Sequence, residues 1–155
     1  MKDIMEKQEH ELPHISVQSQ YLKDFSFENP NAPDSLGSTQ QEPQIDLALD
    51  LHVKKMTEDS HYEVEIAITA KATADDKTLF IIDLKYAGVF FLSNIPDEKR
   101  EMLLAVHCPS ILFPYPRKII ADATQNGGFQ PLMIDPIDFG VLYAKKMLEK
   151  QPSNA

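Results

Sequence analysis

Side chains with reactive chemistry are few in this sequence, and their spacing assembles no catalytic site. His107 and Cys108 are neighbours in the chain, but adjacency does not place the imidazole on the thiol, so a core or interface cysteine is favoured over a nucleophile. The acidic pairs at 75–76 and 97–98 lie at expected turns or helix starts, where solvated carboxylates are normal. Because no nucleophile, base and oxyanion donor come together, we expect a protein that is not an enzyme.

Metal and nucleotide binding find no support in the pattern either. His10 and His14 are four residues apart in a polar leading segment, and the single cysteine excludes a multi-cysteine zinc or iron–sulfur site. No phosphate-binding loop motif is present, and a helix stop explains Gly127-Gly128 better than a phosphate loop does. We therefore expect no metal and no other cofactor.

Composition restricts the class of protein further. The chain has 155 residues, which suits one domain, and 43% of them are hydrophobic. Lys and Arg number 15 against 24 Asp and Glu, a formal charge of -9, which argues against binding nucleic acid or an anionic membrane surface. No apolar stretch is long enough to span a bilayer, and the first residues resemble no signal peptide. We expect a soluble cytoplasmic protein with no direct membrane insertion.

Alternation of apolar and polar residues predicts strands between residues 15 and 92. The clearest case is an aliphatic row at Ile45, Leu47, Leu49, Leu51 and Val53. A similar odd-numbered row places Ile15, Val17, Tyr21, Phe25 and Phe27 on one face of the first strand. Short connections without crossover helices predict a four-stranded antiparallel sheet arranged as a meander, in an α+β fold.

Helices are predicted after the strands. Residues 96–127 show an apolar stripe, but prolines at 109, 114 and 116 require two segments or a kink. The last helix is expected at 135–149, capped by Asp135 with Pro136 in its first turn. The expected organisation is a disordered lead at 1–14, a single domain at 15–149 and a flexible tail at 150–155.

The strands and helices carry more apolar surface than one layer of helices can cover. Residues 78–92 are almost continuously apolar, so we expect them to be covered for part of their length on both faces. The surplus is compatible with a subunit interface or with a groove that accepts apolar segments of another chain. Pattern alone leaves both open, and the net negative charge would attract cationic clients.

Several long strings resemble the SecB family of bacterial protein-export chaperones. The resemblance runs from about residue 13 to 149 and is carried by QSQYLKDFSFENPNAP at 18–33, YAGVF at 86–90, CPSILFPYPR at 108–117, GFQPL at 128–132 and PIDF at 136–139. It implies a four-stranded antiparallel sheet with helices packed on one side. It also implies a homotetramer, built as a dimer of dimers, without catalysis or nucleotide.

The resemblance further implies a holdase that binds unfolded preproteins in the cytoplasm and delivers them to SecA, the translocase motor. The family's SecA-contacting positions are here Asp24 and Glu28 on the first strand, with Ile81 and Asp83 on the fourth. The family pattern has Leu and Glu where this chain has Ile81 and Asp83. Asp24 and Glu28 should point away from the Phe25 and Phe27 side of their strand.

For the client groove, the resemblance points to the second strand, the loop before it and the last helix. The candidate residues are Ile45, Leu47, Leu49, Phe80, Tyr115, Phe139 and Tyr143. The family often has Phe where this chain has Tyr143, and some members carry a longer tail that contacts SecA. One alternative remains open, a SecB-like chaperone that serves a toxin–antitoxin partner.

Overall fold

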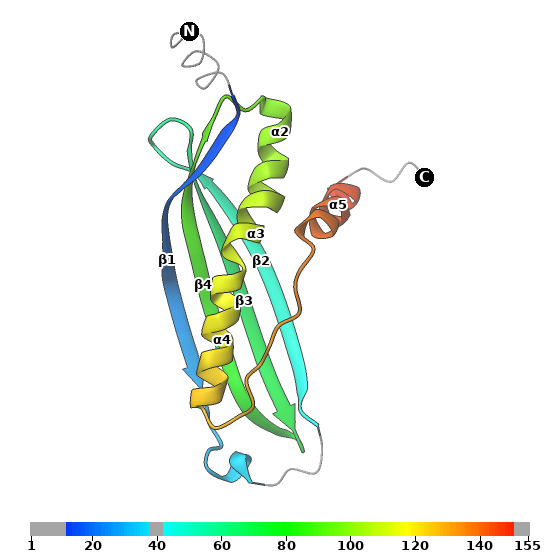
Figure 1. Cartoon of the computed structure of the whole chain (residues 1–155). Coiled ribbons are helices and arrows are strands. Elements are labelled where there is room, and N and C mark those ends of the chain that lie inside the picture. Colours follow the sequence, from blue (N-terminus) through cyan, green and yellow to red (C-terminus); the bar gives the residue numbers. More distant parts are fainter. Residues whose placement is uncertain (1–11, 38–41, 151–155) are drawn as a thin grey trace, which may run out of the picture.

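A twisted four-stranded sheet and a broken helical rod form two layers in the computed structural model, which describes residues 12–37 and 42–150 (Figure 1). The strands are β1 (His14–Glu28), β2 (Gln44–Lys55), β3 (His61–Ala74) and β4 (Lys77–Ser93). All neighbouring strands are antiparallel, in the order β1-β4-β3-β2. The predicted α+β class and antiparallel sheet are therefore confirmed, and helices cover one face of the sheet.

The predicted meander holds only for β2, β3 and β4, and it is wrong for β1. This strand pairs with β4 on the opposite side of the sheet from β2, so the connection between β1 and β2 passes around the end of the sheet. The connection from 29 to 43 is too long for a hairpin and includes the short helix η1 (Asp34–Leu36). It is anchored where the side-chain amides of Asn29 and Asn31 donate to the carbonyls of Gly127 and Thr78. Pairing on both edges makes the apolar β4 a central strand.

Two β-bulges divide β1 and change which side chains share a face. The register against β4 shifts between Val17 and Ser19 and again between Leu22 and Asp24. Tyr21 consequently lies opposite Ala87 on the face away from the helices, whereas Phe25 lies opposite Leu84 on the helix side. The predicted single row of odd-numbered residues is therefore wrong at Tyr21.

The helical rod lies along β3 and β4 and contains the predicted breaks. It consists of α2 (Asp97–Met102), a π-helical turn η2 (Leu103–His107), α3 (Cys108–Leu112) and α4 (Pro114–Asn126). Pro109 has no N–H to continue the ladder, and Pro114 starts a new segment, which explains the irregular centre. Gly128 with φ of 94° follows the rod, as expected for a helix stop.

The last helix, α5 (Phe139–Lys150), begins later than predicted. The carboxylate of Asp138 accepts a hydrogen bond from the amide of Val141, so Asp138 and not Asp135 is the N-cap. The loop before it is fastened to α4, because the amide of Leu132 donates to Thr124 Oγ1 and Arg117 Nε donates to the carbonyl of Ile134. These bonds fix the place from which α5 starts.

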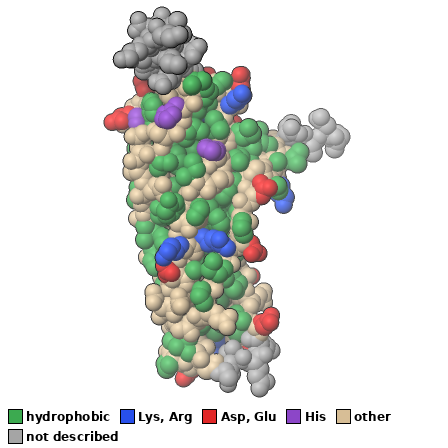
Figure 2. Space-filling view, in the orientation of Figure 1, with side chains coloured by type: hydrophobic (Ala, Val, Ile, Leu, Met, Phe, Trp, Pro, Cys, Tyr) green, Lys and Arg blue, Asp and Glu red, His purple; other side chains and the backbone are tan. Residues whose placement is uncertain are grey.

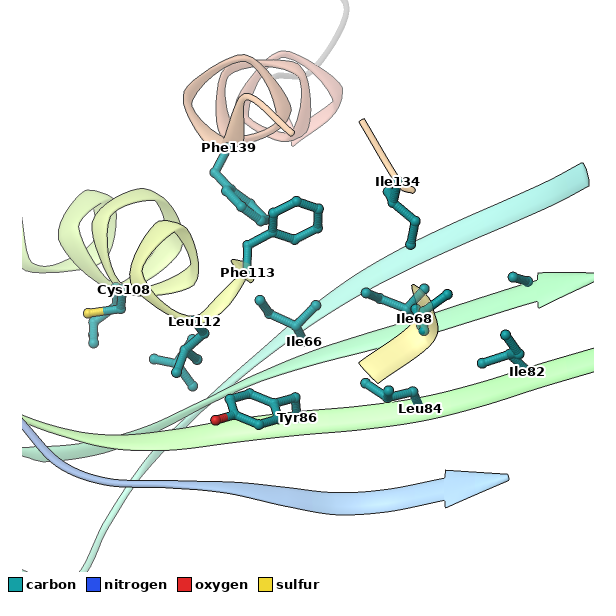
Figure 3. Close-up of a cluster of buried hydrophobic side chains, with 14 of the residues drawn as sticks. Ile66, Ile68, Ile82, Leu84, Tyr86, Cys108, Leu112, Phe113, Ile134 and Phe139 are labelled. Atoms are coloured by element: carbon teal, nitrogen blue, oxygen red, sulfur yellow. The ribbon is translucent and has the colours of Figure 1, made fainter. Parts of the chain in front are cut away.

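The core fills the space between the rod and the central strands β3 and β4. Figure 3 shows Ile66 and Ile68 of β3 and Ile82 and Leu84 of β4 in one cluster with Leu112 of α3. Strand β2 lies outside this cover, and Ile45, Leu47 and Val53 on its helix side are 40%, 45% and 45% exposed. The aliphatic row that predicted a buried face on β2 is thus mostly open in a single chain.

Candidate functional site

The face of the sheet that turns away from the helices, here called the outer face, brings the four predicted SecA-contacting residues together. Residues paired across neighbouring strands point to the same face. Glu28 lies directly opposite Ile81, and Ser26 lies opposite Asp83. Asp24, Glu28 and Asp83 are exposed and lie on the side opposite Phe25, which confirms the side predicted for Asp24 and Glu28.

Two lysines lie beside these carboxylates on the outer face. Lys85 is opposite Asp24, and Lys71 on β3 is opposite Ile81. The carboxylate-bearing positions therefore form a patch with an apolar side chain, Ile81, at one end and mixed charges at the other, where Lys85 and Asp24 lie. Such a patch suits a partner that presents basic groups around an apolar side chain.

A cluster of Tyr21, Lys23, Glu63 and Glu65 on the outer face was not foreseen from the sequence. Lys23 Nζ lies 2.9 Å from Glu63 Oε1 and 3.2 Å from Glu65 Oε1, and the Tyr21 hydroxyl donates to Glu63. The bulge at Lys23 turns this extra residue onto the same face as Asp24. The only sequence signal was the break in alternation at Lys23.

The cluster shifts the ionisation of its members. Burial and the hydrogen bond to Glu63 raise the pKa of Tyr21 to about 12. The hydrogen bond from Tyr21, assisted by Lys23, lowers the pKa of Glu63 despite its desolvation. The hydrogen bonds to Glu63 and Glu65 raise the pKa of Lys23. Tyr21 therefore remains a donor and Glu63 an acceptor at neutral pH.

The predicted client-binding residues divide into an exposed set and a buried set. Ile45 and Leu47 are open on β2, and Leu49 is half-buried. Tyr115 is 49% exposed and stacks on Tyr86, with ring centroids 5.8 Å apart and planes inclined by 2°. These four can offer apolar surface to another chain.

Phe80 and Phe139 belong to the core of this chain. Phe80 is 4% exposed and lies between the rings of Phe27 and Phe129. Phe139 is 2% exposed and meets Phe113 edge-on at 5.9 Å, as Figure 3 shows. Sequence alone could not separate these two residues from the exposed candidates, because it does not reveal which apolar side chains other segments of the chain cover.

Tyr143, the seventh candidate, lines a hollow of about 260 Å³ between β2, the rod and α5. Its walls are formed by Leu51, Val53, Glu101, Leu104, Ala105, Leu142, Tyr143, Lys146, Met147 and Lys150. Figure 2 shows hydrophobic side chains gathered along this side of the molecule, with few charges among them. The hollow and the open row on β2 together make the inner apolar surface.

The residues with reactive chemistry form no site in the described part of the chain. Cys108 is completely buried, and burial raises the pKa of its thiol to about 12, as expected for a core cysteine rather than a nucleophile. Residues 12–37 and 42–150 contain no cluster of three or more potential metal ligands. His10 lies outside the described residues.

Comparison with known proteins identifies the family. The family model described as "Preprotein translocase subunit SecB" matches residues 8–150. The chain belongs to the SecB family. It is 59% identical over 140 residues to the protein-export protein SecB of Rickettsia felis, covering 90% of this chain and 92% of that one. The SecB of Rickettsia bellii is 57% identical over the same share of each chain.

A solved structure of the SecB fold is similar in three dimensions. A SecB-like chaperone of Mycobacterium tuberculosis, in complex with a peptide from the HigA1 antitoxin, matches with a TM-score of 0.64 at 17% identity. The match covers 79% of this chain and 90% of that one. This likeness shows the fold, and the family identifies the chain as a protein-export chaperone of the SecB type. None of the described helices is long and apolar enough to cross a membrane.

Proposed function

We propose that this chain is an ATP-independent holdase that keeps precursor proteins unfolded in the cytoplasm and delivers them to SecA. The observation that supports this most is its 59% identity, over 90% of its length, to a SecB protein of protein export. We further propose that it works as a homotetramer, a dimer of dimers, with part of the exposed apolar surface buried between subunits. The structural neighbour that binds an antitoxin peptide is only 17% identical, so export is favoured over a toxin–antitoxin role.

Client holding follows from the inner apolar surface. Ile45, Leu47, Leu49, Tyr115 and Tyr143 expose apolar side chains without a dense array of specific polar partners. A surface of this kind binds many sequences in an extended state, and binding only the unfolded state prevents folding by mass action. Several weak subsites along one client add avidity.

Delivery to SecA would use the opposite face of the sheet. On the outer face Glu28 lies opposite Ile81, Asp83 lies two residues from it along β4, and Asp24 lies further along β1, while the client residues lie on the helix side. A client and SecA can therefore be bound at the same time without competing for the same side chains. The carboxylates would guide a basic partner, and Ile81 would supply the apolar contact.

The holdase proposal is tested by refolding a slow-folding precursor with and without the full chain, followed by size-exclusion chromatography. We expect arrested refolding and co-elution of precursor and chaperone at tetramer size. Unimpeded refolding, with the chaperone eluting alone, would contradict the proposal.

The SecA proposal is tested with the triple variant Asp24→Lys, Glu28→Lys and Asp83→Lys. We expect this variant to lose SecA binding but still arrest refolding. The charge-matched control, Glu98→Lys, Asp135→Lys and Glu149→Lys, changes exposed carboxylates outside the outer sheet face and should still bind SecA. Equal loss in both triple variants would show a general charge effect and reject a specific contact.

A further inference from the structure

Lys23 and Asp24 are neighbours in the chain and lie on the same face of the sheet. Consecutive side chains of a regular strand alternate between faces, but the register shift between Leu22 and Asp24 interrupts that alternation here. Consecutive Cα atoms are only about 3.8 Å apart, so the long lysine stem can bring its ammonium group to the carboxylate of Asp24. An ion pair between these two residues would occupy a carboxylate that is proposed to contact SecA.

Lys23 pairs instead with two carboxylates of β3. Its Nζ lies 2.9 Å from Glu63 Oε1 and 3.2 Å from Glu65 Oε1. The side chains of Glu63 and Glu65 are only 16% and 10% exposed, whereas Asp24 is an exposed residue. Water screens a partly buried ion pair less than an exposed one, so the two shielded carboxylates hold the ammonium group in preference to Asp24.

A hydrogen bond from Tyr21 fixes the carboxylate of Glu63 in this position. The Tyr21 hydroxyl donates to Glu63 Oε2, and Lys23 Nζ donates to Glu63 Oε1. Each carboxylate oxygen of Glu63 therefore has a partner on β1. This arrangement holds the lysine above β4, on the β3 side of its own strand.

Asp24 consequently keeps its carboxylate free. Within residues 12–37 and 42–150 it forms no ion pair, and neither does Lys85, which lies directly opposite it on β4. This end of the patch thus presents one carboxylate and one ammonium group. A released Lys23 would add a second ammonium group beside the single carboxylate, and the local charge would become positive. A basic partner would then be repelled where it is proposed to bind.

We propose that Glu63 and Glu65 are positioning residues for the partner site, which hold Lys23 away from Asp24 and keep that carboxylate available to a basic partner. This inference rests on the proposed delivery to SecA. It adds two residues that act on the site through Lys23.

The test measures the affinity of SecA for variants of the full chain by isothermal titration calorimetry. The double variant Glu63→Gln and Glu65→Gln releases Lys23, and we expect SecA to bind about 2- to 5-fold more weakly, as the loss of one exposed ion pair would cause. Adding Lys23→Gln should restore most of the affinity. A purely structural role of the cluster predicts no recovery, because the triple variant lacks both of the ion pairs.

Lys54→Gln is the matched control for this recovery. Lys54 is an exposed lysine opposite Glu63 on β2, so adding this substitution to the double variant removes the same charge from the outer face, away from Asp24 on β1. The affinity should then stay reduced. Equal recovery with Lys23→Gln and Lys54→Gln would show an effect of total charge and overturn the proposal.

Asp24→Asn shows whether the effect passes through Asp24. This substitution should weaken SecA binding in the unmodified chain, have little further effect in the double variant, and weaken binding again once Lys23→Gln is added. An equal effect in all three backgrounds would overturn the proposal, because the release of Lys23 would then leave the Asp24 contact unchanged.

Two further measurements make the outcome decisive. Circular dichroism shows whether each variant is folded, and if the double variant is not, Glu65→Gln alone keeps the bonds of Glu63 and should give a smaller loss that Lys23→Gln reverses. SecA that fails to bind the unmodified chain rejects the proposed delivery, and this inference with it. SecA that binds the unmodified chain and the folded glutamine variant equally rejects only the positioning role.

Discussion

Tyr21 on β1 donates its hydroxyl hydrogen to the carboxylate of Glu63 on β3, although β4 lies between these two strands. Lys23 makes the same crossing and reaches Glu63 at 2.9 Å and Glu65 at 3.2 Å. The crossing is possible because the β4 residue in register with both Tyr21 and Glu65 is Ala87, whose methyl group leaves room above the sheet. A bulge in β1 and a small side chain in β4 together allow the cluster that lies next to Asp24.

Enlarging Ala87 should break this crossing. Ala87→Leu would place a branched side chain under Tyr21 and Lys23, where Ala87 is completely buried. We expect a loss of about 1–3 kcal/mol in the free energy of unfolding, measured by urea denaturation. Ala48→Leu, at an exposed position on the outer face of β2, is the control and should change stability by less than about 0.5 kcal/mol. Equal effects of the two substitutions would contradict the packing described for Ala87.

Glu63 should contribute stability that depends on pH. Its pKa is lowered from an ordinary value of 4.5, so its contribution is complete above that value and is lost as pH falls through the lowered pKa. Glu63→Gln should cost about 1 kcal/mol at pH 7, and the difference from the unmodified chain should shrink toward pH 2. Denaturant titrations at several pH values measure this, with Glu98→Gln on α2 as a control outside the cluster. A difference that stays constant with pH would show that the charge of Glu63 does not matter.

Phe139 and Tyr143 stand one helical turn apart on α5 but should behave differently. Phe139→Ala removes a ring from the core and should cost about 3–5 kcal/mol in stability. Tyr143→Ala removes a half-buried wall of the hollow and should weaken client binding with a much smaller loss of stability. Thermal unfolding and the refolding assay, run on both variants, distinguish the two roles. A large loss of stability for Tyr143→Ala, with Phe139→Ala affecting mainly client binding, would contradict the assignment of Phe139 to the core and Tyr143 to the client-binding surface.

The Cys108 thiol should be inert in the folded protein. It is buried, and its pKa is raised to about 12, so little thiolate exists at pH 8 and reagents cannot reach it. Ellman's reagent at pH 8 should react slowly with the native chain and at once in denaturant. Rapid modification of the native protein would place the thiol at an accessible surface.

The sequence by itself determined the local elements and the family. Alternation in β2 and β3 required strands, because every second side chain of a strand faces the same way. Proline at 109 and 114 required a broken helix, because it supplies no amide hydrogen for the ladder. Both rules act over a few residues. The long motifs indicated the family. The sequence also predicted correctly which side of β1 carries Asp24 and Glu28.

Only the tertiary structure decided which elements became neighbours and which apolar side chains became core. Strand β1 could pair with either edge of the hairpins that follow, and its long connection permitted the place beside β4. The bulge between Val17 and Ser19 turns Tyr21 outward, and the bulge between Leu22 and Asp24 returns Phe25 to the helix side. Phe80 and Phe139 are buried whereas Ile45 and Leu47 are open, although all four are equally apolar in sequence. Burial depends on which segment covers each side chain, and that choice is made by contacts between residues far apart in the chain.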